Sequence, residues 1–213
     1  MSRSLRSWVI GVFLAALYVL SLPCFGQSEP DPPPIDLGGS PWTGNKSAPV
    51  TIIEFTDFEC PFCASVQSTL KQLLEQYPNQ IRLVFKNYPL GFHRNARKAH
   101  LAAMCAEEQR KFWPYRYHLF GNQKALKKED LLRYAEGFGL NMEPFERCLE
   151  GEKYSGLLQK DYEQGLLLGV RGTPTFFVNG TYFSGAQPLS FFKSVIEAEL
   201  KRASSKSSES LLS

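Results

Sequence analysis

Two cysteines separated by two residues are the part of this sequence best suited to chemistry. Cys60-Pro61-Phe62-Cys63 follows an apolar run that ends at Phe55. Pro61 fits the first position of a helix, because its fixed φ and missing N–H cost nothing there. Cys60 would then cap that helix, where unpaired backbone N–H groups and the positive helix end favour a thiolate over a thiol. Cys63, one turn further along, would be a more buried and less acidic resolving thiol.

This spacing predicts redox chemistry, with Cys60 as the nucleophile and with Pro61 and Phe62 tuning the redox potential. The alternatives are half of a structural zinc site and a chemically inert pair. A zinc site needs two further ligands at suitable spacing, but the sequence contains no second Cys-x-x-Cys and no paired histidines. We therefore expect neither a metal nor another cofactor.

The N-terminus has the pattern of an export signal. Two arginines precede an apolar run over residues 8–22, which is short for a membrane span, and small residues follow it. We predict a signal peptide over residues 1–26, cleaved before Gln27. An uncleaved membrane anchor and a lipoprotein modified at Cys24 are the alternatives. Export would place the protein in the periplasm or another extracytoplasmic compartment.

Four cysteines remain after such a cleavage, and export would let disulfides persist among them. The close spacing of Cys60 and Cys63 favours their pairing, which leaves Cys105 with Cys148, 43 residues further on. We predict a structural disulfide between Cys105 and Cys148. Two buried free thiols and a second redox-active pair are the alternatives.

The composition is that of a globular protein without a strong charge bias. Hydrophobic residues make up 43% of the chain, and 24 Lys and Arg stand against 21 Asp and Glu. The resulting net charge is too small for the phosphate neutralisation that nucleic-acid binding requires. We expect a monomer with no nucleic-acid partner.

Both ends of the chain differ from its middle. Proline, glycine and serine dominate residues 27–48, which predicts an extended, partly disordered linker. Serine dominates residues 203–213, which predicts a frayed tail. The folded domain is then expected over residues 49–202.

The elements of this domain are predicted from apolar periodicity and turn residues. In order, they are strands at 50–55 and 81–85 around a helix at 61–76, helices over about 93–169, a hairpin at 175–183 with an Asn-Gly turn, and a closing helix at 189–202. This order predicts an α/β protein with the thioredoxin fold, in which an all-helical insertion separates the βαβ and ββα halves.

Three segments together resemble the DsbA-like thiol-disulfide oxidoreductases of the bacterial cell envelope. They are residues 55–63, 84–90 and 172–180, and the resemblance covers about residues 45–200. It implies a cis peptide bond before Pro174, beside the active disulfide, and contact between Thr173 and the substrate chain.

The same resemblance implies that Glu54 and Lys86 lie beneath the disulfide and help to move protons during exchange. The alternative is that each side chain emerges to solvent at a strand end. Strongly oxidising members of the family carry a histidine where this chain has Phe62. Since Phe62 offers no polar group to a thiolate, the disulfide would be a weaker oxidant.

Aromatic residues gather at two places. Those in residues 111–120 have helical spacing, which predicts core packing for most of them. Phe58 and Phe62 flank the cysteines and are predicted to form a peptide-docking surface.

The sequence thus predicts an exported enzyme that exchanges its Cys60–Cys63 disulfide with reduced or misfolded secreted proteins, as an oxidase. The resemblance implies recycling by a membrane-bound thiol oxidase. The alternatives are a reductase or isomerase of the same fold, a non-catalytic, chaperone-like peptide-binding module, and a metal-handling protein that uses both thiols as soft ligands.

Overall fold

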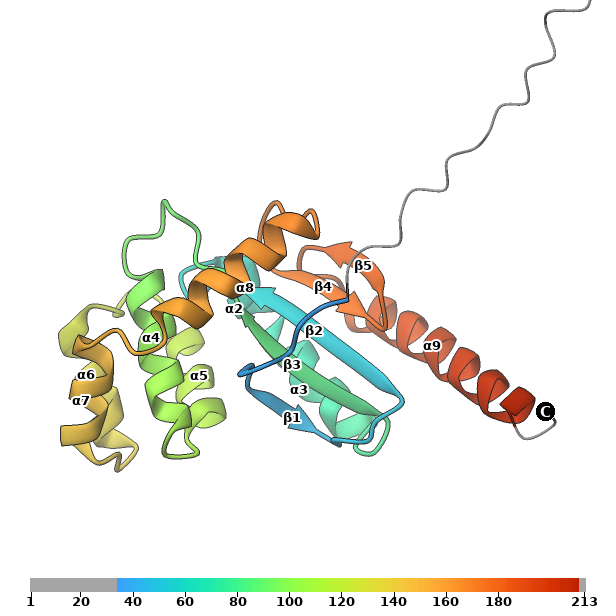
Figure 1. Ribbon diagram of the computed structural model, residues 1–213, viewed down its shortest axis with the longest axis horizontal. Helices are drawn as coiled ribbons and strands as arrows, with labels where there is room; N and C mark the ends of the chain where they lie inside the picture. The colour runs from blue at the N-terminus through green and yellow to red at the C-terminus, as the bar shows by residue number, and fades with distance from the viewer. Residues whose placement is uncertain (1–33, 211–213) are drawn as a thin grey trace, which may run out of the picture. The chain divides into compact units, whose positions relative to one another are not determined.

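The computed structural model describes residues 34–210 (Figure 1). The predicted signal peptide, the first residues of the predicted linker and residues 211–213 lie outside the described part. The elements are β1 (Trp42–Gly44), β2 (Val50–Thr56), α2 (Pro61–Ser65), α3 (Gln67–Gln76), β3 (Ile81–Asn87), α4 (Ala96–Glu107), α5 (Phe112–Gly121), α6 (Lys128–Gly137), α7 (Met142–Glu150), α8 (Ser155–Leu167), β4 (Thr175–Val178), β5 (Thr181–Ser184) and α9 (Leu189–Ser210).

A five-stranded sheet in the order β1-β3-β2-β4-β5 forms the centre of the structure. Strands β2 and β3 are parallel, whereas the other neighbours are antiparallel. The pairing of β2 with β4 sets Phe55 opposite Thr175. Because the strands are antiparallel, the residues just before β4 lie beside the end of β2. This register brings together two segments that are more than 100 residues apart in the sequence. They meet at the C-terminal end of β2, just before the cysteines.

Helices cover both faces of the sheet. On one face, β2, β3 and β4 pack against α3 and α9. On the other face, residues of the same strands pack around Tyr88 and Val170, and α8 lies against β3. Gly165 lets α8 approach closely, since a Cβ at this position would lie 2.5 Å from the ring of Tyr88. This layered arrangement confirms the predicted α/β thioredoxin fold.

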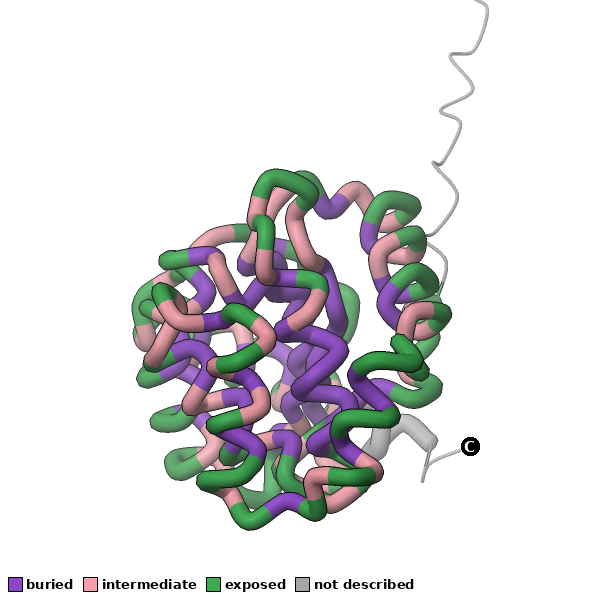
Figure 2. Tube along the Cα trace, turned by 90° about the vertical axis from the view of Figure 1, so that its left-hand side faces the viewer, coloured by how far each residue is buried: buried purple, intermediate pink, exposed green. Residues whose placement is uncertain are grey.

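Helices α4 to α7 form the insertion and lie together beside the sheet (Figure 1). They share one apolar core. In Figure 2, which faces this side of the structure, buried stretches of the chain alternate with exposed ones. A disulfide joins Cys105 of α4 to Cys148 of α7. Between β3 and β4 the described chain forms only helices, α4 to α8, and α8 lies against both α4 and β3.

Three boundaries differ from the sequence-based expectation. Within the predicted linker, β1 pairs with residues 82–84 of β3. Three residues are too few to show a strand period, and Gly44 is required there, since a Cβ would lie 2.5 Å from the carbonyl oxygen of Ile81. The predicted serine-rich tail continues α9 as far as Ser210, because extending an anchored helix adds one hydrogen bond for each residue fixed.

The helix predicted over 61–76 is divided at Val66 into α2 and α3. In a regular helix the carbonyl of Cys63 would accept a hydrogen bond from the backbone N–H of Gln67. Here it accepts one from Gln67 Nε2 at 2.6 Å. A side chain that enters the hydrogen-bond ladder in this way is a recognised cause of helix distortion.

Candidate active site

Cys60 occupies the first turn after the central strand. Its backbone is extended, with φ −75° and ψ 119°, and it caps α2, in which Pro61 takes the first position. The carbonyl of Cys60 accepts hydrogen bonds from the N–H groups of Cys63 and Ala64. Both cysteines are free thiols; Cys60 is 5% exposed and Cys63 is fully buried. The structure therefore shows the reduced pair, with Cys60 as the more accessible sulfur.

The two thiols differ strongly in acidity. Hydrogen bonds from the Cys63 thiol, and to a lesser extent from the backbone N–H groups of Cys63 and Phe62, lower the pKa of Cys60 from its ordinary 9.0 to about 6, against the opposing effect of burial. Burial raises the pKa of Cys63, and its hydrogen bond to Cys60 and the charges of Cys60 and Glu54 act in the same direction. Cys60 is thus suited to attack and Cys63 to remain a protonated thiol until it is needed.

The loop before β4 completes the site. The peptide bond between Thr173 and Pro174 is cis, as the family resemblance implied. Cys60 Sγ donates a hydrogen bond to the carbonyl oxygen of Thr173 at 3.2 Å. This contact places the sulfur beside the backbone segment that precedes β4.

A buried ion pair lies on the Cys63 side of the sheet. Glu54 pairs with Arg116 of α5, and both side chains have no exposed surface. Gln67 Nε2 donates to Glu54 Oε1 at 3.3 Å, while Gln67 Oε1 accepts from Arg116 at 2.5 Å. Gln67 also contacts the carbonyl of Cys63. A continuous set of hydrogen bonds therefore runs from the helical insertion to the backbone of the second cysteine.

Lys86 does not lie beneath the cysteines, so that implication of the resemblance is wrong. The parallel register sets Glu54 opposite Phe85 and Phe55 opposite Lys86, so Glu54 and Lys86 project from opposite faces of the sheet. Lys86 forms an ion pair with Asp161 of α8. It also donates to the carbonyl of Asp36 at 2.7 Å. The cation beside Glu54 is Arg116, which sequence analysis assigned to the aromatic core segment.

The two phenylalanines that flank the cysteines have different environments. Phe62 is 65% exposed, in agreement with a place on a docking surface. Phe58 is fully buried and packs against Phe85, His100 and Phe120, so its predicted exposure is wrong. Residues 57–60 form a tight turn, with the N–H of Cys60 bonded to the carbonyl of Asp57, and this turn directs Phe58 into the core.

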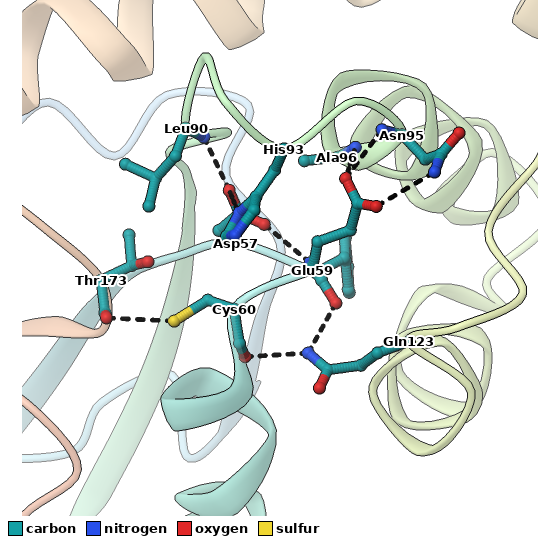
Figure 3. Close-up of polar contacts among 10 residues, drawn as sticks. Asp57, Glu59, Cys60, Leu90, His93, Asn95, Ala96, Gln123 and Thr173 are labelled. Carbon is teal, nitrogen blue, oxygen red and sulfur yellow. Dashed lines mark hydrogen bonds and ion pairs between the residues drawn. The ribbon is translucent and has the colours of Figure 1, made fainter.

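Two carboxylates hold this turn in place (Figure 3). Asp57 accepts hydrogen bonds from the N–H of Leu90 at 2.6 Å and contacts His93 Nδ1 at 3.0 Å. Glu59 accepts from the N–H groups of Asn95 and Ala96, at 2.7 and 2.8 Å, at the start of α4. The negative charge of Glu59 therefore stabilises a helix N-terminus that is distant in sequence.

Sequence reasoning missed Arg116, Gln67, Asp57, Glu59 and Gln123 as parts of the site. Arg116 carried one usable signal, since it is the cation on the buried side of an aromatic helix. It packs with its guanidinium 4.9 Å from the ring centre of Phe120. Within residues 34–210, no group of three or more His, Cys, Asp and Glu side chains could hold a metal ion.

A family model described as thioredoxin matches residues 36–198. The chain belongs to the thioredoxin family. A thioredoxin-like oxidoreductase from Silicibacter pomeroyi superposes with a TM-score of 0.71 at 27% identity, over 77% of this chain and 94% of that one. Wolbachia pipientis alpha-DsbA1 superposes with a TM-score of 0.71 at 21% identity, over 81% and 96%. These matches confirm the predicted thioredoxin-like fold. Within it, the structure places the paired thiols of Cys60 and Cys63 at the start of α2.

Sequence relatives include much longer proteins. The chain is 38% identical to the Na(+)/H(+) antiporter NhaA 3 of Salinispora tropica over 153 residues, which are 71% of this chain and 23% of that protein. The chain spans about a quarter of the length of the curated relatives it matches. In the part of this thioredoxin-family chain that the structure describes, no helix is both long and apolar enough to cross a membrane.

Proposed function

We propose that this protein is a thiol-disulfide oxidoreductase that acts as an oxidase and introduces disulfides into exported proteins. The observation that carries the proposal is the lowered pKa of Cys60, about 6, at the N-terminus of α2. At pH 7 about nine-tenths of the reduced protein would hold Cys60 as a thiolate. Stabilising the reduced form makes the disulfide form a better electron acceptor. Electrons would therefore pass from the substrate thiols to the Cys60–Cys63 disulfide of the enzyme.

The reaction has two steps. A substrate thiolate attacks Cys60 Sγ of the oxidised enzyme, the bond between Cys60 and Cys63 breaks, and Cys63 leaves as a thiolate that takes up a proton. A second substrate thiol then loses its proton and attacks the mixed disulfide at the substrate sulfur, so that Cys60 leaves as a thiolate. Two electrons pass from the substrate to the enzyme. Glu54 supports the proton transfer at Cys63, because it is the buried acid on the same face of the sheet.

Exposed apolar side chains support binding of unfolded substrate chains. Phe62 follows Cys60 by two residues, Phe92 lies in the loop that Asp57 and Glu59 hold, and Leu167 precedes the loop of Thr173. They are 65%, 75% and 79% exposed, respectively. An unfolded protein presents apolar segments that a folded one buries, so such a surface favours reduced, incompletely folded substrates.

The proposal includes an extracytoplasmic location and a recycling partner. The predicted signal peptide supports export. The disulfide between Cys105 and Cys148 fits an oxidising compartment, because disulfides rarely persist in the cytosol. A membrane-bound thiol oxidase would restore the Cys60–Cys63 disulfide after each cycle, and we propose that the enzyme acts as a monomer.

The redox potential of the Cys60–Cys63 couple tests the direction. We expect equilibration with glutathione to give a redox potential between the reductant end of known couples, about −270 mV, and the strong-oxidant end, about −120 mV, because the pKa of Cys60 is lowered only to about 6. A value near −270 mV would instead indicate a disulfide reductase, an outcome that the apolar Phe62 beside Cys60 would favour.

A trapping experiment tests the chemistry itself. The Cys63→Ser variant should accumulate a mixed disulfide with an unfolded substrate that carries a disulfide, because the Cys60 thiolate opens that bond, one substrate thiol is released, and the resolving thiol is absent. Cys60→Ser should trap nothing, since Cys63 is fully buried. Replacement of both cysteines by serine should abolish oxidation of a two-cysteine peptide. If the double variant retained the full effect on substrate folding, the protein would be a peptide-binding module rather than an oxidase.

A further inference from the structure

Gln123 lies between α5 and α6 in the helical insertion and reaches the turn that carries Cys60. Its side-chain Nε2 donates hydrogen bonds to the carbonyl oxygens of Phe58 and Cys60, each at 2.8 Å (Figure 3). One amide group therefore bridges two carbonyls on either side of Glu59. Among the described residues, no other side chain is hydrogen-bonded to either of these carbonyls.

The carbonyl of Cys60 is the first acceptor of α2. It accepts hydrogen bonds from the backbone N–H groups of Cys63, at 3.1 Å, and of Ala64, at 3.2 Å. Its orientation relative to the Cα–Cβ bond of Cys60 is given by ψ, which is 119° here, so a contact that fixes the carbonyl restricts rotation about ψ. The orientation consequently sets where Sγ lies relative to the donors of Phe62 and Cys63. A group that fixes this carbonyl also fixes the geometry that stabilises the thiolate.

The remaining contacts of the turn hold its earlier part. Asp57 and Glu59 connect it to residues 90–96, as described above. Neither of these carboxylates contacts Cys60 itself, whose backbone N–H is bonded to the carbonyl of Asp57. Gln123 is thus the side chain through which the insertion contacts the backbone of the nucleophilic cysteine.

We propose that Gln123 is a positioning residue that maintains the acidity of Cys60 and, through it, the oxidising strength of the disulfide. The inference rests on the proposed oxidase function and extends it to a residue of the insertion. Loss of the amide donor releases the carbonyl of Cys60 and weakens the alignment of Sγ with the N–H groups of α2. The thiolate is then less stabilised, and the disulfide becomes a weaker oxidant.

The test compares two glutamines that bridge segments at opposite ends of α5. Gln109 donates to the carbonyl of Asn141 at 3.1 Å and accepts from its N–H at 2.8 Å. Gln109→Met and Gln123→Met each remove such a bridge while keeping the side-chain length. The readouts are the pKa of Cys60, from the ultraviolet absorbance of the thiolate against pH, the glutathione equilibrium constant, and the free energy of unfolding of the reduced protein.

We expect Gln123→Met to raise the pKa of Cys60 and to shift the glutathione equilibrium about three- to tenfold toward the disulfide, the range for loss of one hydrogen bond. Gln109→Met should lower the free energy of unfolding but leave the pKa and the equilibrium unchanged. Gln123→Glu, which removes the donors and adds a negative charge, should raise the pKa further. It serves as the second variant if Gln123→Met does not fold.

Two results would overturn the inference. If both Gln123 variants matched Gln109→Met, with the acid dissociation constant of Cys60 and the glutathione equilibrium constant within twofold of wild type, Gln123 would have a structural role only, and the oxidase proposal would stand. If the unaltered protein itself titrated near the ordinary cysteine pKa, the oxidase proposal would fall and this inference with it.

Discussion

The two faces of the central sheet each contain a buried ion pair, and only one pair is near the cysteines. Glu54 and Arg116 lie on the face toward Cys63, whereas Lys86 and Asp161 lie on the face covered by α8. All four side chains are at most 1% exposed. The charge of Glu54 contributes to the raised pKa of Cys63. Asp161, by contrast, accepts further hydrogen bonds from the backbone and side chain of the residue after Lys86.

Burial of a charged residue in a strand is therefore weak evidence for a catalytic role. Both pairs carry a similar desolvation cost, and each is stabilised by its partner and by hydrogen bonds. The difference arises from the alternation of a strand, which sends neighbouring positions to opposite faces. One pair is joined through Gln67 to the carbonyl of Cys63. The other connects α8 and the segment before β1 to the sheet.

The largest effect should come from breaking either pair, and it should be similar for both. Arg116→Met and Lys86→Met each leave a buried carboxylate without its cation, which costs about 3–5 kcal/mol in other proteins. Chemical denaturation of the oxidised variants would measure the loss. A loss confined to Arg116→Met would show that the Lys86 pair is not the structural connection described here.

The pH dependence of the unfolding free energy should reveal the contribution of the Cys60 thiolate. The pKa of Cys60 is depressed in the folded protein to about 6 from 9.0. Its stabilisation is therefore fully present above pH 9 and is lost as the pH falls through about 6. Between these values, the unfolding free energy of the reduced protein relative to the oxidised protein should rise by about 1.36 kcal/mol per pH unit. Other groups cancel in this difference, so a flat profile would contradict the lowered pKa.

Neutralising the acid of each ion pair should slow peptide oxidation only for Glu54, the acid on the face toward Cys63. Glu54→Gln removes the buried acid beside Cys63, and we expect peptide oxidation to slow by about tenfold. This is less than the hundredfold or more of direct general acid-base catalysis, because no hydrogen bond joins the carboxylate to the sulfur. Asp161→Asn should leave the rate per folded molecule unchanged. Equal slowing by both variants would mean that the distinction between the faces has no catalytic meaning.

The smallest effect concerns the acidity of Cys60. Arg116→Met leaves the negative charge of Glu54 uncompensated near the thiols, which should raise the pKa of Cys60 by up to about one unit. Lys86→Met should leave it unchanged, since Lys86 lies across the sheet. Alkylation rates against pH give both values. If the pKa of Cys60 changed only in Lys86→Met, the Lys86 pair rather than the Arg116 pair would be the one that acts on the thiols.

Local patterns predicted most of the fold. The β-branched runs predicted β2 and β3, the helical spacing predicted the helical stretch that contains α4 to α8, and the Asn179-Gly180 turn predicted the final hairpin. These elements were predictable because each is long or contains a strong turn signal. Strand β1 has only three residues and depends on pairing with β3, so nothing local could indicate it.

The sequence by itself determined the chemistry of the nucleophile. A cysteine before proline at a helix start, with a second cysteine one turn on, has the main donor to its sulfur, the Cys63 thiol, within the same turn. The tertiary structure decided which charged residues accompany it. Arg116 and Gln123 come from the insertion, more than 50 residues beyond Cys63, and Lys86 faces away from the site. Their placement depends on strand register and helix packing, which are set by long-range contacts that no short segment records.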